Sequence, residues 1–87
     1  MQDYIVIDVR EPDEYAQGHV EGAINIPPDQ LLAGAPQLKD IPKDHPIILY
    51  CKSGARSNSA SHILDALGFT NLTNGINKDQ VNMRFLK

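Results

Sequence analysis

Cys51 is the residue with the clearest capacity for chemistry, and it is the only cysteine in the 87-residue chain. A lone cysteine cannot form an intramolecular disulfide or a multi-cysteine metal site, so it is either a small buried hydrophobe or a reactive thiol. It opens the segment Cys-Lys-Ser-Gly-Ala-Arg over residues 51–56, in which a glycine and two cations follow the sulfur. That composition suits a thiolate nucleophile beside an anion-binding loop.

The charges around Cys51 differ in sign from those of the whole chain. The formal net charge is -3 at pH 7, yet no Asp or Glu occurs between residues 45 and 64, where Lys52 and Arg56 lie. The local field is therefore positive, which predicts an anionic substrate. Either cation alone would suit a solvated loop equally well, and it is their combination with the cysteine and Gly54 that favours a function.

The elements on either side of this segment must position the thiol. Residues 46–50 form an apolar run, which predicts a strand buried on both faces, as in a parallel sheet. Ligands of such sheets bind beyond the carboxyl ends of the strands, where Cys51 lies. The N–H groups of residues 52–57 can surround the sulfur, Gly54 permits the positive φ that this requires, and a following helix adds a partial positive charge.

That following helix is indicated by four apolar residues at helical spacing, with Gly68 placed to end it: Ala60, Ile63, Leu64 and Leu67. Further strands are predicted over residues 5–7, 22–26 and 71–73. Helices are predicted over residues 12–18, 30–33 with Asp29 as the cap, and 79–86, with one more turn over 38–40. The alternation predicts an α/β fold: a single domain over residues 1–87 with a central, mostly parallel sheet flanked by helices.

The composition also excludes several classes of protein. An estimated pI of about 5.4 argues against nucleic-acid binding, and no apolar run approaches the ~20 residues that span a bilayer. The first residues do not have the pattern of a signal peptide, so a cytoplasmic location is expected, or a periplasmic one if a signal has been removed. We expect a monomer that needs no cofactor and no metal.

Three segments together resemble the rhodanese homology domain family over nearly the whole chain. They are residues 7–15 (IDVREPDEY), 18–27 (GHVEGAINIP) and 50–57 (YCKSGARS). The chain is most similar to minimal single-domain thiosulfate sulfurtransferases of the phage shock protein E type. It departs from the family where a pair of glycines usually follows the last strand, since Asn74-Gly75 stands there, and it lacks the tryptophan common a few residues later.

The resemblance implies a function and a set of site residues. The Cys51 thiolate would take the outer sulfur of thiosulfate as a persulfide and pass it to a thiol, a protein thiol or cyanide. The substrate would be bound by the loop that follows Cys51: Lys52, Ser53, Gly54, Ala55, Arg56 and Ser57. Asp8 and Arg10, at the end of the first strand, would either line the pocket or form a structural ion pair.

Two other functions remain open from the sequence. One is a non-catalytic module that binds proteins, although such modules usually lose the cysteine. The other is a phosphatase or arsenate reductase of the kind related to this fold. Those enzymes have C-x5-R loops that enclose a tetrahedral phosphate, whereas Cys51 and Arg56 form the shorter C-x4-R.

Overall fold

Four parallel strands form one sheet in the structure, a computed structural model that describes residues 4–85. The strands are β1 (Ile5–Asp8), β2 (Ile24–Asn25), β3 (Ile47–Cys51) and β4 (Leu72–Asn77), in the order β2-β1-β3-β4. The chain adds β2 on one side of β1 and β3 on the other. The carboxyl ends of β1 and β3 therefore lie where the strand order reverses, the usual ligand position in α/β sheets.

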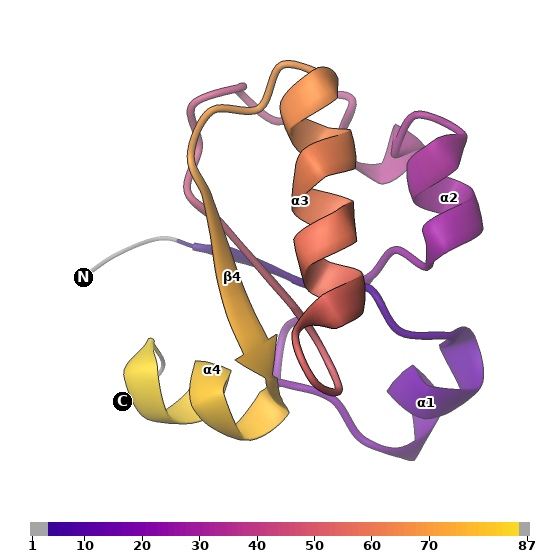
Figure 1. Ribbon diagram of the computed structural model, residues 1–87, viewed down its shortest axis with the longest axis vertical. Helices are drawn as coiled ribbons and strands as arrows, with labels where there is room; N and C mark the ends of the chain where they lie inside the picture. Colours follow the sequence, from indigo (N-terminus) through magenta and orange to yellow (C-terminus); the bar gives the residue numbers. More distant parts are fainter. Residues whose placement is uncertain (1–3, 86–87) are drawn as a thin grey trace.

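Helices cover both faces of this sheet, as predicted. α2 (Pro28–Leu32), the 3-10 helix η1 (Pro36–Leu38) and α3 (Ala55–Ala66) pack on one face, and α4 (Lys78–Arg84) packs on the other. α1 (Pro12–Gln17) lies at the carboxyl end of the sheet. Figure 1 shows the loop between β3 and α3 at the lower end of the molecule, between α1 and α4.

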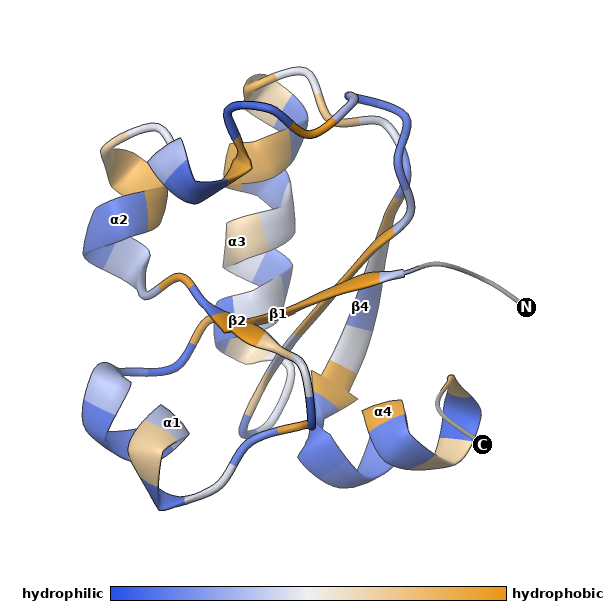
Figure 2. Cartoon of the chain, turned by 180° about the vertical axis from the view of Figure 1, so that it is seen from behind, coloured by the Kyte–Doolittle hydropathy of each residue, from blue (hydrophilic) through white to orange (hydrophobic). Residues whose placement is uncertain are grey.

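The side chains of β3 are divided between two cores. Ile47, Leu49 and Cys51 belong to the core under α2 and α3, and Ile48 and Tyr50 belong to the core that includes Val81 of α4. All five strand residues are buried, which confirms the burial on both faces that their apolar run predicts. Figure 2 shows the hydrophobic colour along β1 in the middle of the molecule, whereas much of β4 is hydrophilic. A thiol at the end of this strand thus stands on a rigid support.

The helix after the cysteine loop ends as predicted. Gly68 has φ 100°, its N–H bonds to the carbonyl of Asp65, and the N–H of Phe69 bonds to the carbonyl of Leu64. This pair of bonds is the Schellman motif, which explains the glycine. Of the four apolar residues that indicate this helix, Leu67 lies one residue beyond its last residue, Ala66, and is 37% exposed.

The last strand is longer than the predicted residues 71–73. Its pairing with β3 shifts register by one residue between Asn74 and Ile76, so Gly75 is the extra residue of a β-bulge. A Cβ at Gly75 would lie 2.6 Å from Val81 Cγ2 and 2.9 Å from Ile48 Cγ2, so only glycine fits. The predicted strand is present but continues further, because the bulge at Gly75 lets its pairing with β3 reach Asn77.

Other boundaries differ by a few residues. Asp29 does not cap α2, because Pro28 already stands at the first helical position, which its fixed φ suits. The short turn lies at Pro36–Leu38 instead of residues 38–40, the second strand is only Ile24–Asn25, and α4 begins at Lys78. Residue 86, the predicted end of that last helix, lies outside the described residues. Within residues 4–85, no helix is long and apolar enough to cross a membrane.

Candidate active site

The sulfur of Cys51 lies inside the loop that follows β3. It accepts hydrogen bonds from the N–H of Gly54 at 3.0 Å and from the N–H of Ser57 at 3.4 Å, and the Ser57 hydroxyl lies 3.5 Å away. Gly54 has φ 96°, the left-handed conformation that the sequence predicts for it. The loop therefore presents backbone donors to the sulfur, and Cys51 itself is only 2% exposed.

The surroundings of Cys51 favour the thiolate. Burial by itself raises the pKa of this thiol. Hydrogen bonds to the sulfur outweigh burial and lower the pKa to about 7. They come from the N–H groups of Ser57, Ser53 and Gly54, and from the Ser57 hydroxyl when its single proton turns from Asn74 Oδ1 toward the sulfur. Near neutral pH a large fraction of Cys51 is thus a thiolate held by fixed dipoles.

Asn74 of β4 holds the loop in this form. Its Nδ2 donates to the carbonyl of Gly54 at 3.1 Å, and its Oδ1 accepts from the Ser57 hydroxyl at 2.7 Å and from the N–H of Ile76 at 2.9 Å. In the sequence, Asn74 stands out only as a departure from the family's glycine pair. The available signal was that the departure introduces an amide, which can bond to a loop where glycine cannot.

Arg56 points away from α3 and forms an ion pair with Glu14 of α1. Its two terminal nitrogens lie 2.7 and 3.1 Å from the carboxylate oxygens. The hydrogen bond from Arg56, with help from the N–H of Glu11, lowers the pKa of Glu14 to about 2. The pKa of Arg56 is raised, chiefly by Glu14 and to a smaller extent by the negative charge of Cys51. The loop cation therefore has a carboxylate partner that its own sequence neighbourhood lacks.

The other residues predicted to bind substrate occupy different places. Lys52, Ser53 and Ala55 are exposed on the rim of the loop, while Ser57 is buried against the sulfur. The structure thus brings Gly54 and Ser57 to the thiol and leaves the rest of the predicted set around it. Their contacts with a substrate stay predictions.

Asp8 and Arg10 form an ion pair at the end of β1. The Arg10 Nη2 lies 2.7 Å from Asp8 Oδ2, and the same oxygen accepts the Tyr50 hydroxyl at 2.8 Å. Asp8 is fully buried, and burial raises the pKa of Tyr50. Of the two alternatives for this pair, the geometry favours the structural one for Asp8, whereas Arg10 also borders a cavity.

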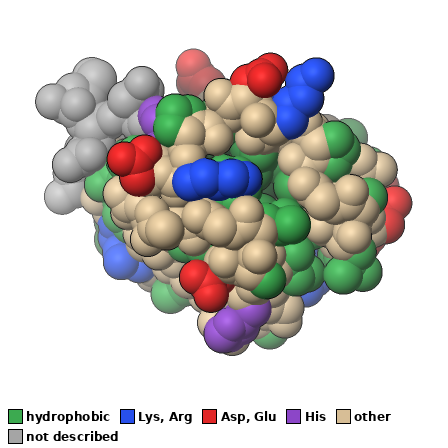
Figure 3. Space-filling model, turned by 90° about the horizontal axis from the view of Figure 1, so that it is seen from above, with side chains coloured by type: hydrophobic (Ala, Val, Ile, Leu, Met, Phe, Trp, Pro, Cys, Tyr) green, Lys and Arg blue, Asp and Glu red, His purple; other side chains and the backbone are tan. Residues whose placement is uncertain are grey.

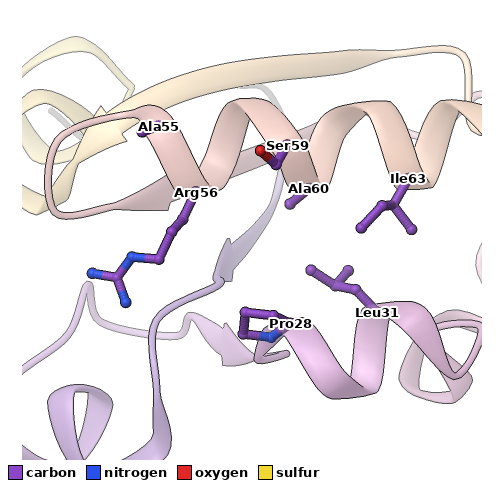
Figure 4. A pocket seen from close by; sticks show the side chains of 7 residues that line it. All are labelled: Pro28, Leu31, Ala55, Arg56, Ser59, Ala60 and Ile63. Carbon is purple, nitrogen blue, oxygen red and sulfur yellow. The ribbon is translucent and has the colours of Figure 1, made fainter.

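Two cavities flank the cysteine loop. An apolar one of about 300 Å³ lies between α2 and α3, and Figure 4 shows Pro28 and Leu31 facing Ala60 and Ile63 across it, with Arg56 directed away. A polar one of about 270 Å³ is lined by residues of α1, the loop and α4: Arg10, Glu14, Gln17, Gly18, Lys52 and Lys78. The ion pair of Arg56 and Glu14 lies between them, since each partner borders one cavity.

Comparison with known proteins agrees with this geometry. The model of the rhodanese-like domain family matches residues 1–80. The thiosulfate sulfurtransferase PspE of Escherichia coli is 39% identical over an alignment of 72 positions, which covers 78% of this chain and 64% of that protein. A sulfurtransferase of Allochromatium vinosum is 34% identical over 73 residues, 84% of this chain and 65% of that protein. The chain thus spans slightly less than two thirds of these relatives.

Solved structures show the same arrangement. A rhodanese with anions from E. coli superposes with a TM-score of 0.74 at 34% identity, covering 90% of this chain and 91% of that one. A rhodanese-related protein from Thermoplasma volcanium superposes with a TM-score of 0.71 at 32% identity, covering 92% of this chain and 76% of the other.

Proposed function

Because the chain belongs to the rhodanese-like domain family, we propose that it is a sulfurtransferase that moves a sulfane sulfur through a persulfide on Cys51. One observation carries the proposal. The sulfur of Cys51, at the carboxyl end of a buried strand, accepts hydrogen bonds from the N–H groups of Gly54 and Ser57, and the pKa of this thiol is lowered to about 7. A thiolate that is both nucleophile and leaving group benefits from such donors in each half of the reaction.

In the first half-reaction the donor is thiosulfate. The Cys51 thiolate attacks the outer sulfur, the sulfur–sulfur bond of thiosulfate breaks, and sulfite leaves with the bonding electron pair. In the second half-reaction an acceptor thiolate attacks the outer sulfur of the persulfide. The bond to Cys51 then breaks, and the electron pair returns to the Cys51 sulfur, where the N–H groups of Gly54 and Ser57 stabilise it again.

The two rival functions lack this support. A non-catalytic binding module has no need of a buried thiol with a lowered pKa. A phosphatase needs a loop wide enough for a tetrahedral phosphate, whereas the C-x4-R loop here brings two N–H groups directly to the sulfur. We include in the proposal a cytoplasmic location, because the unpaired thiol suits a reducing compartment.

The deciding experiment is intact mass spectrometry after incubation with thiosulfate. The wild type should gain the mass of one sulfur atom, and a thiol should remove it. Cys51→Ser is the matched control, since it keeps the loop and loses the nucleophile. Addition of sulfur to Cys51→Ser would contradict the assignment, and so would hydrolysis of an aryl phosphate at the rate of sulfur transfer.

A further inference from the structure

The polar cavity beside the cysteine loop carries unbalanced positive charge. Arg10 is paired with Asp8 and Glu14 with Arg56, each at 2.7 Å, so these two cavity residues are neutralised by their partners. Lys52 and Lys78 also line the cavity. Neither of these lysines makes an ion pair or a side-chain hydrogen bond with any residue between 4 and 85. The cavity thus keeps two positive charges in a chain whose net charge is -3.

Gly18 brings the cations together. Its carbonyl accepts Arg10 Nη2 at 2.7 Å, and a methyl group in place of its hydrogen would lie 3.4 Å from Lys78 Nζ. The Lys78 ammonium therefore lies against the backbone that also binds Arg10. Lys52 approaches from the loop, directly after Cys51 in the chain. Two lysines from segments 26 residues apart thus border the same space as the reactive loop.

The size of the cavity argues for an organic ligand. A volume of about 270 Å³ is close to the lower end of small-molecule pockets, roughly 300 Å³, and a thiosulfate ion would leave most of it empty. Cys51 does not line the cavity and is 2% exposed, but Lys52 beside it does, and a persulfide places a second, reactive sulfur one S–S bond of about 2 Å from the Cys51 sulfur. An acceptor held at the loop rim must then reach only the outer sulfur.

We infer that this cavity binds the carboxylates of a small thiol that accepts the sulfur, with Lys52 and Lys78 as the cationic groups. The inference rests on the proposed function. The acceptor thiolate attacks the outer sulfur and becomes a persulfide, and Cys51 leaves as the thiolate. The lysines act on binding of the acceptor, and they have no part in the breaking of bonds.

The test separates the two half-reactions. The protein is first loaded with sulfur by thiosulfate, and decay of the persulfide is then followed by intact mass with two thiols, the dianionic mercaptosuccinate and the uncharged 2-mercaptoethanol. The wild-type persulfide should decay faster with mercaptosuccinate than with 2-mercaptoethanol, once each rate is corrected for the fraction of that thiol present as thiolate. High salt should reduce this preference. Lys78→Gln should slow the decay of the persulfide with mercaptosuccinate about three- to fivefold, and its decay with 2-mercaptoethanol should change by less than twofold.

Two variants control for folding and for total charge. Lys78→Arg keeps a cation and should keep the preference. Lys43→Gln makes the same change of charge at the other end of the molecule, where the Lys43 ammonium lies 4.2 Å from the centre of the Phe69 ring. Figure 3 shows this end, on which acidic and basic side chains are interspersed. Lys43→Gln should therefore retain the preference for mercaptosuccinate.

The outcomes distinguish the inference from the proposed function. If thiosulfate forms no persulfide, the proposed function fails. The cavity is then tested by adding succinate to Cys51→Ser and following its backbone amide signals. Succinate should shift the signals of Gly18, Lys52 and Lys78 in Cys51→Ser. It should not shift them in the double variant that carries both Cys51→Ser and Lys78→Glu. A persulfide that forms normally but shows no preference for mercaptosuccinate overturns the inference. An effect of Lys78→Gln on persulfide formation alone would assign the cavity to the donor and overturn it as well.

Discussion

The carboxyl ends of β1 and β3 lie side by side, and each ends in a buried group that can be an anion. Asp8 pairs in register with Tyr50, the residue before Cys51. Asp8 is 0% exposed and Cys51 is 2% exposed. At the end of β1 the donors are mainly side chains, the Arg10 guanidinium and the Tyr50 hydroxyl, with one backbone N–H, that of Arg10. At the end of β3 they are mainly backbone N–H groups, with one hydroxyl.

This difference separates a structural anion from a reactive one. A guanidinium bonded to both oxygens of a carboxylate neutralises its charge and occupies its lone pairs, so little remains for a substrate. Backbone N–H groups carry only partial charges, so they favour the thiolate without neutralising it and leave the sulfur a nucleophile. The cations near Cys51 stand further out, on the loop rim and in the polar cavity. We therefore expect the end of β1 to serve stability and the end of β3 to serve the proposed sulfur transfer.

The largest expected effect tests the structural side. Asp8→Ala leaves the Tyr50 hydroxyl without its acceptor and leaves the Arg10 guanidinium with only the Gly18 carbonyl, next to a buried site, which should cost about 3–5 kcal/mol of unfolding free energy. Urea denaturation measures it. Tyr50→Phe is the milder control, with a loss of about 1 kcal/mol. An unchanged urea midpoint for Asp8→Ala would remove Asp8 from the structural role and return it to the pocket.

The next effect concerns the half-exposed ion pair. Arg56→Ala should lower kcat/KM for thiosulfate about tenfold, because it removes a charge-assisted contact to the dianion. Glu14→Gln keeps Arg56 and removes its ion-pair partner, so kcat/KM for thiosulfate should not fall. Unfolding free energies should change little in both, since such exposed pairs are weak. If the two variants lose activity equally, Arg56 serves the ion pair and not the donor.

The third effect concerns the pH at which Cys51 becomes reactive. Its pKa is lowered to about 7, so persulfide formation should rise with pH through 7 and level off above it, because only the thiolate attacks. Ser57→Ala removes the hydroxyl nearest to the sulfur and should move this inflection to higher pH. Below the inflection, each unit of increase in pKa lowers the rate about tenfold. Coincident profiles for the two proteins would show that the backbone donors suffice.

The smallest effect concerns the amide that holds the loop. Asn74→Gly removes the hydrogen bonds to Gly54 and Ser57 and should cost about 1 kcal/mol of unfolding free energy, with less than threefold loss in persulfide formation. Asn71→Gly places a second glycine just before the same strand, away from the loop, and corrects for the flexibility that glycine introduces. Equal losses in the two variants would mean that Asn74 contributes nothing through its amide.

Much of the fold could be predicted from local patterns. The apolar run over residues 46–50, the helical spacing from Ala60 onward and Gly68 are local signals, and each corresponds to its element. The bulge in β4 could not be predicted in this way. It depends on Ile48 and Val81 leaving no room for a side chain at Gly75, and those residues meet only in the folded sheet.

The sequence by itself determined the cysteine loop, because its thiol, its glycine and its N–H donors lie within seven consecutive residues, and hydrogen bonds over so few residues depend on local backbone conformation. The tertiary structure decided which distant groups surround that loop. Glu14 is 42 positions from Arg56, and Asn74 is 17 positions from Ser57. Such partners meet only when the strand order places α1 and β4 on either side of β3, and no local pattern encodes the distance between segments that separate strands bring together.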